Sequence, residues 1–183
     1  MNDENLQEDL LAWGRLLGQR VEALGFGLIA TAESCTGGLL ASALTETAGS
    51  SGWFSRGYVT YANQAKIDML GVDPDCLQAE GAVSLPVVRQ MALGALQSSD
   101  ILLSMAVSGV AGPGGGSPEK PVGTICFGWA LRWPPGTDTP LLVAETMHFS
   151  GNRSEIREQV AIHALRRALQ LLEQAQGDQP AAA

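Results

Sequence analysis

The sequence predicts an α/β fold, a three-layer α/β/α sandwich with a mixed central sheet. Three observations lead to this prediction. Early in the chain, short apolar runs alternate with segments of helical periodicity, which is typical of parallel strands covered by helices on both faces. Later, two apolar runs flank a Pro-Gly loop, which indicates an antiparallel hairpin. A long amphipathic segment then closes the fold.

The first elements follow from the spacing of apolar residues. Helical spacing from Leu6 to Leu24 predicts a helix that ends at Gly25. The apolar run from Phe26 to Ala32 predicts a buried strand. The polar stretch from Glu33 to Gly38 then predicts a turn, and Leu39 to Thr47 predicts a second helix.

The middle of the chain alternates in the same way. Tyr58 to Tyr61 predicts a short strand, and Ala62 to Leu70 predicts a helix. Ser84 to Gln97 predicts a stronger helix with Ser84 as its N-cap. Asp100 to Val107 predicts a second buried strand.

The last part of the chain predicts the hairpin and a closing helix. Val122 to Trp133 and Leu141 to Phe149 are two expected strands, joined by a loop from Pro134 to Pro140. Gly151 to Gln174 predicts an amphipathic helix. We therefore expect a single domain over 1–176 and a disordered tail over 177–183.

Composition narrows the function classes. The chain has 183 residues, is 45% hydrophobic and carries a net charge of −8, which argues against binding to nucleic acids or to an anionic membrane surface. It shows neither a membrane-spanning apolar run nor a secretion signal, so we expect a cytoplasmic protein. Three cysteines without a C-x-x-C pair and only two histidines give no disulfide framework and no metal site. We expect neither a metal nor a cofactor.

The turn after the first buried strand holds the first candidate site. A strand-to-helix junction lies at the carboxyl edge of a sheet and offers free backbone N–H groups to a phosphate or an oxyanion. Ser34 is well placed there as a nucleophile, but a helix cap is the alternative, because serine is a preferred cap. Cys35 is a rival nucleophile without an evident base. The expected ligand contacts of this turn are Glu33, Cys35, Thr36, Gly37 and Gly38.

A candidate base follows the next strand. Lys66 is one of only two lysines in the chain, and lysine, unlike arginine, can give up its proton when burial lowers its pKa. Ser-Lys catalysis is a known alternative to Ser-His-Asp, and Tyr61 could orient the lysine or relay its proton. The alternative is that Lys66 is solvated and Tyr61 belongs to the core.

Two more stretches favour ligand binding. Five glycines within 109–116 allow a ligand to approach the backbone closely, although a flexible surface loop is the alternative. Arg153 begins the closing helix, where a bound phosphate or carboxylate would offset the unfavourable placement of a cation. Arg157 fits a salt-bridged, solvated face equally well. The expected ligand contacts in the glycine-rich stretch are Ser108, Gly109, Gly112, Gly114 and Gly115.

Together these stretches resemble one family. The similarity covers nearly the whole chain and rests on long, ordered motifs: Ala32–Gly38, Val59–Tyr61 with Asn63 and Lys66, Gly81–Ser84, Ser108–Gly116 and Pro121–Thr124. These motifs look like those of the CinA C-terminal domain family, whose stand-alone members are nicotinamide-nucleotide amidohydrolases. The resemblance implies hydrolysis of nicotinamide mononucleotide to nicotinic acid mononucleotide and ammonia, within pyridine nucleotide salvage.

The resemblance also implies roles for particular residues. A Ser-Lys-Tyr set falls on Ser34, Lys66 and Tyr61, and Asn63 and Arg153 join the substrate contacts. It implies a small-molecule nucleotide substrate and a homodimer. The alternative is a non-catalytic nucleotide-binding sensor on the same fold, which would bind the nucleotide without releasing ammonia.

Overall fold

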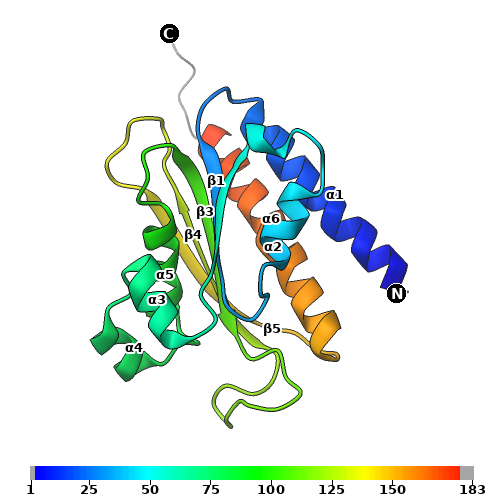
Figure 1. Ribbon diagram of the computed structural model, residues 1–183, viewed down its shortest axis with the longest axis vertical. Coiled ribbons are helices and arrows are strands. Elements are labelled where there is room, and N and C mark those ends of the chain that lie inside the picture. The colour runs from blue at the N-terminus through cyan, green and yellow to red at the C-terminus, as the bar shows by residue number, and fades with distance from the viewer. Residues whose placement is uncertain (1–2, 178–183) are drawn as a thin grey trace.

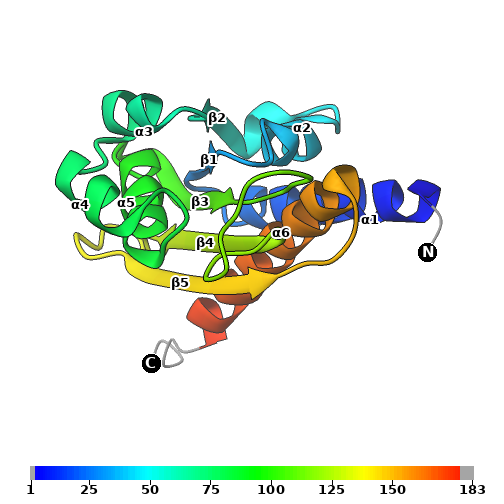
Figure 2. The same cartoon turned by 90° about the horizontal axis from the view of Figure 1, so that it is seen from below.

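A computed structural model describes residues 3–177 as a mixed sheet held between two layers of helices (Figures 1 and 2). The α/β sandwich expected from the sequence is confirmed. In chain order the elements are α1 (Asp3–Glu22), β1 (Leu28–Glu33), α2 (Leu39–Thr45), the 3₁₀ turn η1 (Ser50–Gly52), β2 (Phe54–Val59), α3 (Asn63–Leu70), α4 (Pro74–Glu80), α5 (Leu85–Ala95), β3 (Ile101–Gly109), β4 (Thr124–Leu131), β5 (Leu141–His148) and α6 (Arg153–Gly177).

The sheet places the ends of three parallel strands side by side. Its order is β2-β1-β3-β4-β5, with β1 parallel to both of its neighbours. The strands β3, β4 and β5 then alternate in direction, so the expected late hairpin is confirmed. Glu33, the last residue of β1, lies opposite Val59 on β2 and Val107 on β3. The loops that follow these three strands therefore leave the sheet at one common edge.

The two faces of the sheet carry different cores. The helices α1, α2 and α6 cover one face, where large side chains such as Phe127 and Trp129 are buried. The helices α3, α4 and α5 lie on the other face (Figure 1). Strand residues facing α5 are mostly small, and a Cβ on Gly128 would overlap the backbone carbonyl of Val88. This small-residue face lets the backbone of α5 lie close against the sheet.

Several boundaries differ from those expected. The first helix ends at Glu22, two residues earlier than expected, and a turn follows it as far as Gly25, which has a φ of 73°. The strand expected at Tyr58–Tyr61 begins earlier, at Phe54, and ends at Val59. Ser84 occupies the N-cap position of α5, but its hydroxyl donates to the carbonyl of Gly81 at 2.8 Å instead of accepting from the helix.

One helix was not expected, and the last helix ends later than expected. The helix α4 was not expected, although Asp73 caps it by accepting from the Asp75 amide at 2.9 Å and Pro74 opens it. The closing helix extends to Gly177, so the expected tail begins one residue too early. Positions 178–183 of that tail, and the side chain of Leu6, lie outside what the structure describes.

The structure was also compared with the requirements of a membrane-spanning helix and of a metal site. Within residues 3–177, no helix combines the length and the apolar character needed to cross a membrane. The same part of the chain holds no cluster of three or more His, Cys, Asp or Glu side chains suited to a metal ion.

Candidate active site

A buried carboxylate shapes the turn after β1. The side chain of Glu33 has no solvent exposure and accepts four hydrogen bonds. Three come from the first backbone amides of α2, those of Gly38 (2.9 Å), Leu40 (3.1 Å) and Ala41 (2.9 Å). The fourth comes from the hydroxyl of Thr31 at 3.1 Å. Glu33 was expected to contact the ligand, but its carboxylate is sealed against the helix that it caps, which gives it a supporting position beneath Ser34.

The elbow that Glu33 stabilises carries Ser34 at its corner. Ser34 is partly exposed, its amide donates to the carbonyl of Val107 at 3.0 Å, and its own carbonyl accepts from Gly37 at 3.1 Å. Gly37 and Gly38 both have positive φ angles, of 61° and 98°, which L side chains rarely adopt. The two glycines therefore allow the chain to turn from β1 into α2 within a few residues.

Lys66 reaches this elbow from α3. Its Nζ donates to Ser34 Oγ at 3.2 Å, to the carbonyl of Thr60 at 2.8 Å and to the carbonyl of Tyr61 at 3.3 Å. Ser34 and Lys66 are separated by 32 positions in the chain, and the structure brings them into contact. A serine hydroxyl and a lysine amine at this separation have the geometry of a nucleophile and its general base.

The surroundings of Lys66 favour the neutral amine. Only 1% of Lys66 is exposed, and no carboxylate in residues 10–177 is a hydrogen-bond partner of its amine. Burial lowers the pKa of Lys66 below its usual value of 10.5, and the nearby Cys35 thiol opposes that change only in part. A lysine with a lowered pKa is a better base near neutral pH than a solvated one.

Tyr61 meets the pair through its backbone only. Its carbonyl accepts from Lys66, whereas its side chain is 59% exposed and its hydroxyl accepts from Nη2 of Arg153 at 3.0 Å. The structure therefore gives no contact between the phenol and either Ser34 or Lys66. The expectation that the Tyr61 hydroxyl orients the base is not met by this geometry.

Arg153 links the glycine-rich loop to Tyr61. Its Nη1 donates to the carbonyl of Gly112 at 2.7 Å, while Nη2 holds the Tyr61 hydroxyl. Arg153 remains exposed, and a guanidinium has five N–H donors, so it can still meet an anionic group of a ligand. Exposed Asn63 begins α3 nearby in sequence, and exposed Gly114 and Gly115 lie farther along the loop.

The backbone amides after Ser34 are unequally available. The Gly37 amide donates to Ser34 and the Gly38 amide donates to Glu33, so neither is free for an oxyanion. The amides of Cys35 and Thr36 point at the Cys35 sulfur, a weak acceptor, and donate to no oxygen in the described part of the chain. The side chains of these two residues are buried, and burial raises the pKa of the Cys35 thiol to about 12, which leaves Cys35 a poor rival nucleophile.

One residue of the site was missed by the sequence reasoning. The Nη2 of Arg157 donates to the carbonyl of Thr36 at 2.6 Å, across 121 positions of the chain. Its Nε and the hydroxyls of Thr36 and Thr60 are buried without partners. Arg157 was given a solvated, salt-bridged role as an equal alternative, whereas here it supports the backbone next to Ser34. The helical position of Arg157 offered no signal of that contact.

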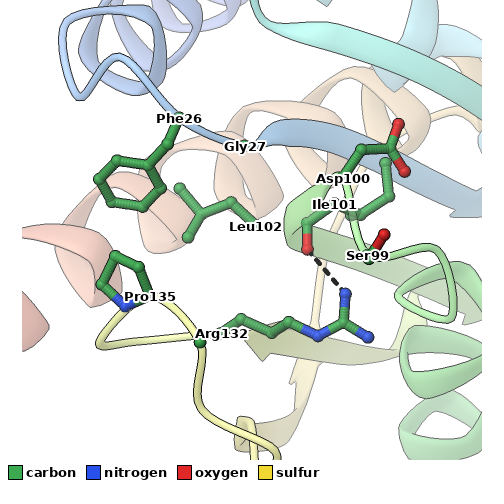
Figure 3. A pocket seen from close by; sticks show the side chains of 9 residues that line it. Phe26, Gly27, Ser99, Asp100, Ile101, Leu102, Arg132 and Pro135 are labelled. Carbon is green, nitrogen blue, oxygen red and sulfur yellow. Dashed lines mark hydrogen bonds between the residues drawn. The ribbon is translucent and has the colours of Figure 1, made fainter.

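A separate hollow lies at the amino ends of β1 and β3, at the far end of these strands from Ser34 (Figure 3). It has a volume of about 160 Å³ and is lined on one side by Phe26, Leu102 and Pro135. Arg132 lines the other side, and its Nη1 donates to the carbonyl of Ile101 at 3.1 Å and to that of Ser98 at 2.6 Å. These bonds connect the end of β4 to the start of β3, so they stabilise the sheet.

Known proteins are similar to this chain in sequence and in fold. A family model described as the CinA C-terminal domain matches residues 18–172. The chain is 49% identical over 153 residues to a protein of Enterobacter agglomerans named nicotinamide-nucleotide amidohydrolase PncC, and the match covers 84% of this chain and 89% of that protein. Among solved structures, the competence/damage inducible protein CihA from Agrobacterium tumefaciens has a TM-score of 0.83 and 43% identity, covering 90% of this chain and 96% of the other.

Other relatives are longer. A CinA-like protein of Mycolicibacterium gilvum is 49% identical over 173 residues, which is 92% of this chain but only 40% of that protein. A relative from Symbiobacterium thermophilum is 53% identical, and the chain spans 35% of its length. The similarity to these longer relatives therefore concerns one part of each.

Proposed function

The chain belongs to the CinA C-terminal domain family, and from that premise we propose that it hydrolyses the carboxamide of nicotinamide mononucleotide to nicotinic acid mononucleotide and ammonia. The name of the Enterobacter agglomerans relative supports the substrate and the reaction. The observation that carries the proposal is the 3.2 Å contact between Ser34 Oγ and the buried Nζ of Lys66. This contact supplies what amide hydrolysis needs first, a nucleophile with a base beside it.

The first step forms an acyl-enzyme. Neutral Lys66 takes the proton of the Ser34 hydroxyl as Oγ attacks the carboxamide carbon. The carbonyls of Thr60 and Tyr61 hold the Lys66 amine in place and stabilise the ammonium that forms. We assign the developing oxyanion to the amides of Cys35 and Thr36, which bond only to the weak acceptor Cys35 sulfur, because those of Gly37 and Gly38 already donate to oxygen.

The second half of the reaction releases the products. The protonated Lys66 returns its proton to the departing nitrogen, the C–N bond breaks and ammonia leaves. Water then attacks the acyl-enzyme, with Lys66 again acting as the base, and Ser34 is regenerated. Arg157 contributes from a distance, since its bond to the Thr36 carbonyl fixes the backbone next to the amides of Cys35 and Thr36.

The remainder of the substrate is assigned to the exposed polar groups around Ser34. Arg153 offers a guanidinium to the phosphate, as the chemistry of phosphate recognition favours. Its bond to Gly112 positions the glycine-rich loop beside the same ligand. Asn63 and the exposed Gly114 and Gly115 are the proposed contacts for the ribose.

The proposal is tested by measuring ammonia release from nicotinamide mononucleotide. We expect release by the wild-type protein and a loss of about 10⁴-fold or more in Ser34→Ala. Ser42→Ala is the matched control, because Ser42 is an exposed serine of the neighbouring helix α2 and should retain activity. A Ser34→Ala protein with the wild-type rate would refute the scheme.

The same experiment separates catalysis from sensing. A non-catalytic sensor would be stabilised against heat by the nucleotide and would release no ammonia. That result would replace the proposed activity with nucleotide binding at the same surface.

A further inference from the structure

A row of hydroxyl and thiol side chains crosses the sheet at the level of Ser34. The registers of β1 with β2 and with β3 pair Glu33 with Val59 and Val107. One residue farther along, Ser34 lies level with Thr60 on one side and Ser108 on the other. The amide of Thr60 donates to the carbonyl of Glu33 (2.8 Å), and the amide of Ser34 donates to the carbonyl of Val107 (3.0 Å). These bonds extend the β1–β2 and β1–β3 pairing as far as Ser34.

Ser108 shares a face of the sheet with Ser34. Side chains alternate along a strand, so Ser104 and Ser108 of β3 point to the same side. The hydroxyl of Ser104 donates to the carbonyl of Ala92 in α5 at 2.7 Å, which identifies that side as the one covered by α5 and α3. Lys66 comes from α3 and meets Ser34 on this side as well. Neighbouring strands lie about 4.8 Å apart, so a single small chemical group fits between the two serine hydroxyls.

Ser34 therefore stands between two different groups. Lys66 lies on the β2 side, because its amine is held by the carbonyls of Thr60 and Tyr61. Ser108 lies on the opposite side, toward β3. It is 1% exposed, and its hydroxyl has no hydrogen-bond partner in the described part of the chain. The next residue of the row, Cys126, is paired with Thr146 at 3.4 Å and so is directed away from Ser108.

We propose that Ser108 is a catalytic residue that binds the amide nitrogen of the substrate on the side of Ser34 opposite the base. This inference rests on the proposed function and adds a group to it. Among the described residues, the sealed hydroxyls without a partner are those of Thr36 and Thr60, so the small exposed area of Ser108 leaves its unpaired hydroxyl open to a ligand or water. The carboxamide NH₂ group, placed over Ser34, brings an N–H donor to that position.

The proton balance leaves Ser108 unchanged. The proton of Ser34 passes to Lys66 and then to the nitrogen, the C–N bond breaks, and NH₃ departs. Throughout, the oxygen of Ser108 accepts a hydrogen bond from one N–H of the substrate nitrogen. This bond orients the lone pair of the nitrogen toward the Lys66 ammonium. An ester of the same acid has no N–H and cannot make this bond, so Ser108 should matter for amides alone.

The test compares two substrates in one set of variants. For nicotinamide mononucleotide and for the methyl ester of nicotinic acid mononucleotide, kcat/KM is measured, because it reports the acylation step. We expect Ser108→Ala to lower the amide value by about 10- to 100-fold, as for the loss of one hydrogen bond in the transition state. The ester value should stay near that of the wild type, and Ser108→Thr should recover most of the amide value.

Ser104→Ala is the matched control. Ser104 lies on the same strand and face and is fully buried, but its hydroxyl serves α5. The control should lose stability without changing the ratio of amide to ester hydrolysis. Equal losses for both substrates in Ser108→Ala, or no loss for the amide, would overturn the inference while leaving Ser34 as nucleophile. A wild-type protein that releases no ammonia would overturn the proposed function and this inference together.

Discussion

Replacing Glu33 by glutamine tests whether the Ser34 elbow depends on a buried carboxylate. Glutamine has the same shape, but one carboxylate oxygen becomes an NH₂ group that cannot accept a hydrogen bond. The glutamine oxygen can still accept the hydrogen bonds from the amides of Gly38 and Leu40, which both donate to Oε2 of Glu33. The NH₂ group then faces the amide of Ala41 and the hydroxyl of Thr31, which bond to Oε1.

The expected loss follows from those four bonds. The Thr31 hydroxyl can turn and accept from the NH₂ group, so its bond survives. The Ala41 amide cannot turn, and an unpaired buried N–H costs about 1 to 3 kcal/mol. The two retained bonds lose their charged acceptor, which weakens them by about 1 kcal/mol together. We therefore expect Glu33→Gln to lower the free energy of unfolding by about 2 to 4 kcal/mol, a large share of the 5 to 15 kcal/mol typical of a domain.

Urea unfolding measures this loss as a lower midpoint at an unchanged slope. Thr31→Val is the control, because it removes only one of the four bonds and should cost about 1 kcal/mol. Ammonia release should fall with Glu33→Gln even where the protein is fully folded, since Ser34 follows directly. A Glu33→Gln protein within about 0.5 kcal/mol of the wild type would refute the reasoning, because that is the range of ordinary surface changes.

Three further predictions concern the residues around Ser34. Lys66→Met should abolish ammonia release and yet raise the free energy of unfolding by about 1 kcal/mol or more in thermal melts, because it replaces a buried amine with an apolar side chain of similar length; a less stable variant would contradict this. Since burial lowers the pKa of Lys66 and the base must be neutral, kcat/KM should rise with pH and level off below 10.5; a flat profile would argue for another base. Tyr61→Phe should mainly raise KM, within about tenfold in kcat, because its hydroxyl meets Arg153 only; a loss as large as that of Ser34→Ala would restore the phenol to the chemistry.

The fold was accessible from the sequence where periodicity and turn residues agree. The apolar runs of β1 and β3 and the hairpin of β4 and β5 were predicted because buried strands need continuous apolar residues and the loop carries Pro and Gly. The helix α4 was missed because seven residues are too few to show a helical period, although Asp73 and Pro74 are a start signal. The start of β2 was missed because this edge strand alternates weakly, with partly exposed residues from Phe54 onward.

The site was accessible only where contacts are local or carried by a motif. Ser34 and Lys66 were singled out from their positions after strands and from the family resemblance. The capping role of Glu33 was open to inference, since an acidic residue before a helix favours its N-terminal amides. The contact of Arg157 with Thr36 joins distant parts of the chain, and no local pattern encodes it. The direction of the Tyr61 side chain likewise depends on Arg153 in the closing helix.

The cap formed by Glu33 determines when the backbone around Ser34 becomes ordered. Because three amides of α2 are satisfied by a side chain of β1, the corner that carries Ser34 is rigid as soon as the chain has folded. The conformational entropy of that corner is therefore lost during folding. Ligand binding does not have to order the corner and so does not bear this free-energy cost. Hydrogen-bond donors that already point at a developing charge need little rearrangement during a reaction. The rate should therefore depend on how the ligand is positioned and not on a movement of the backbone around Ser34.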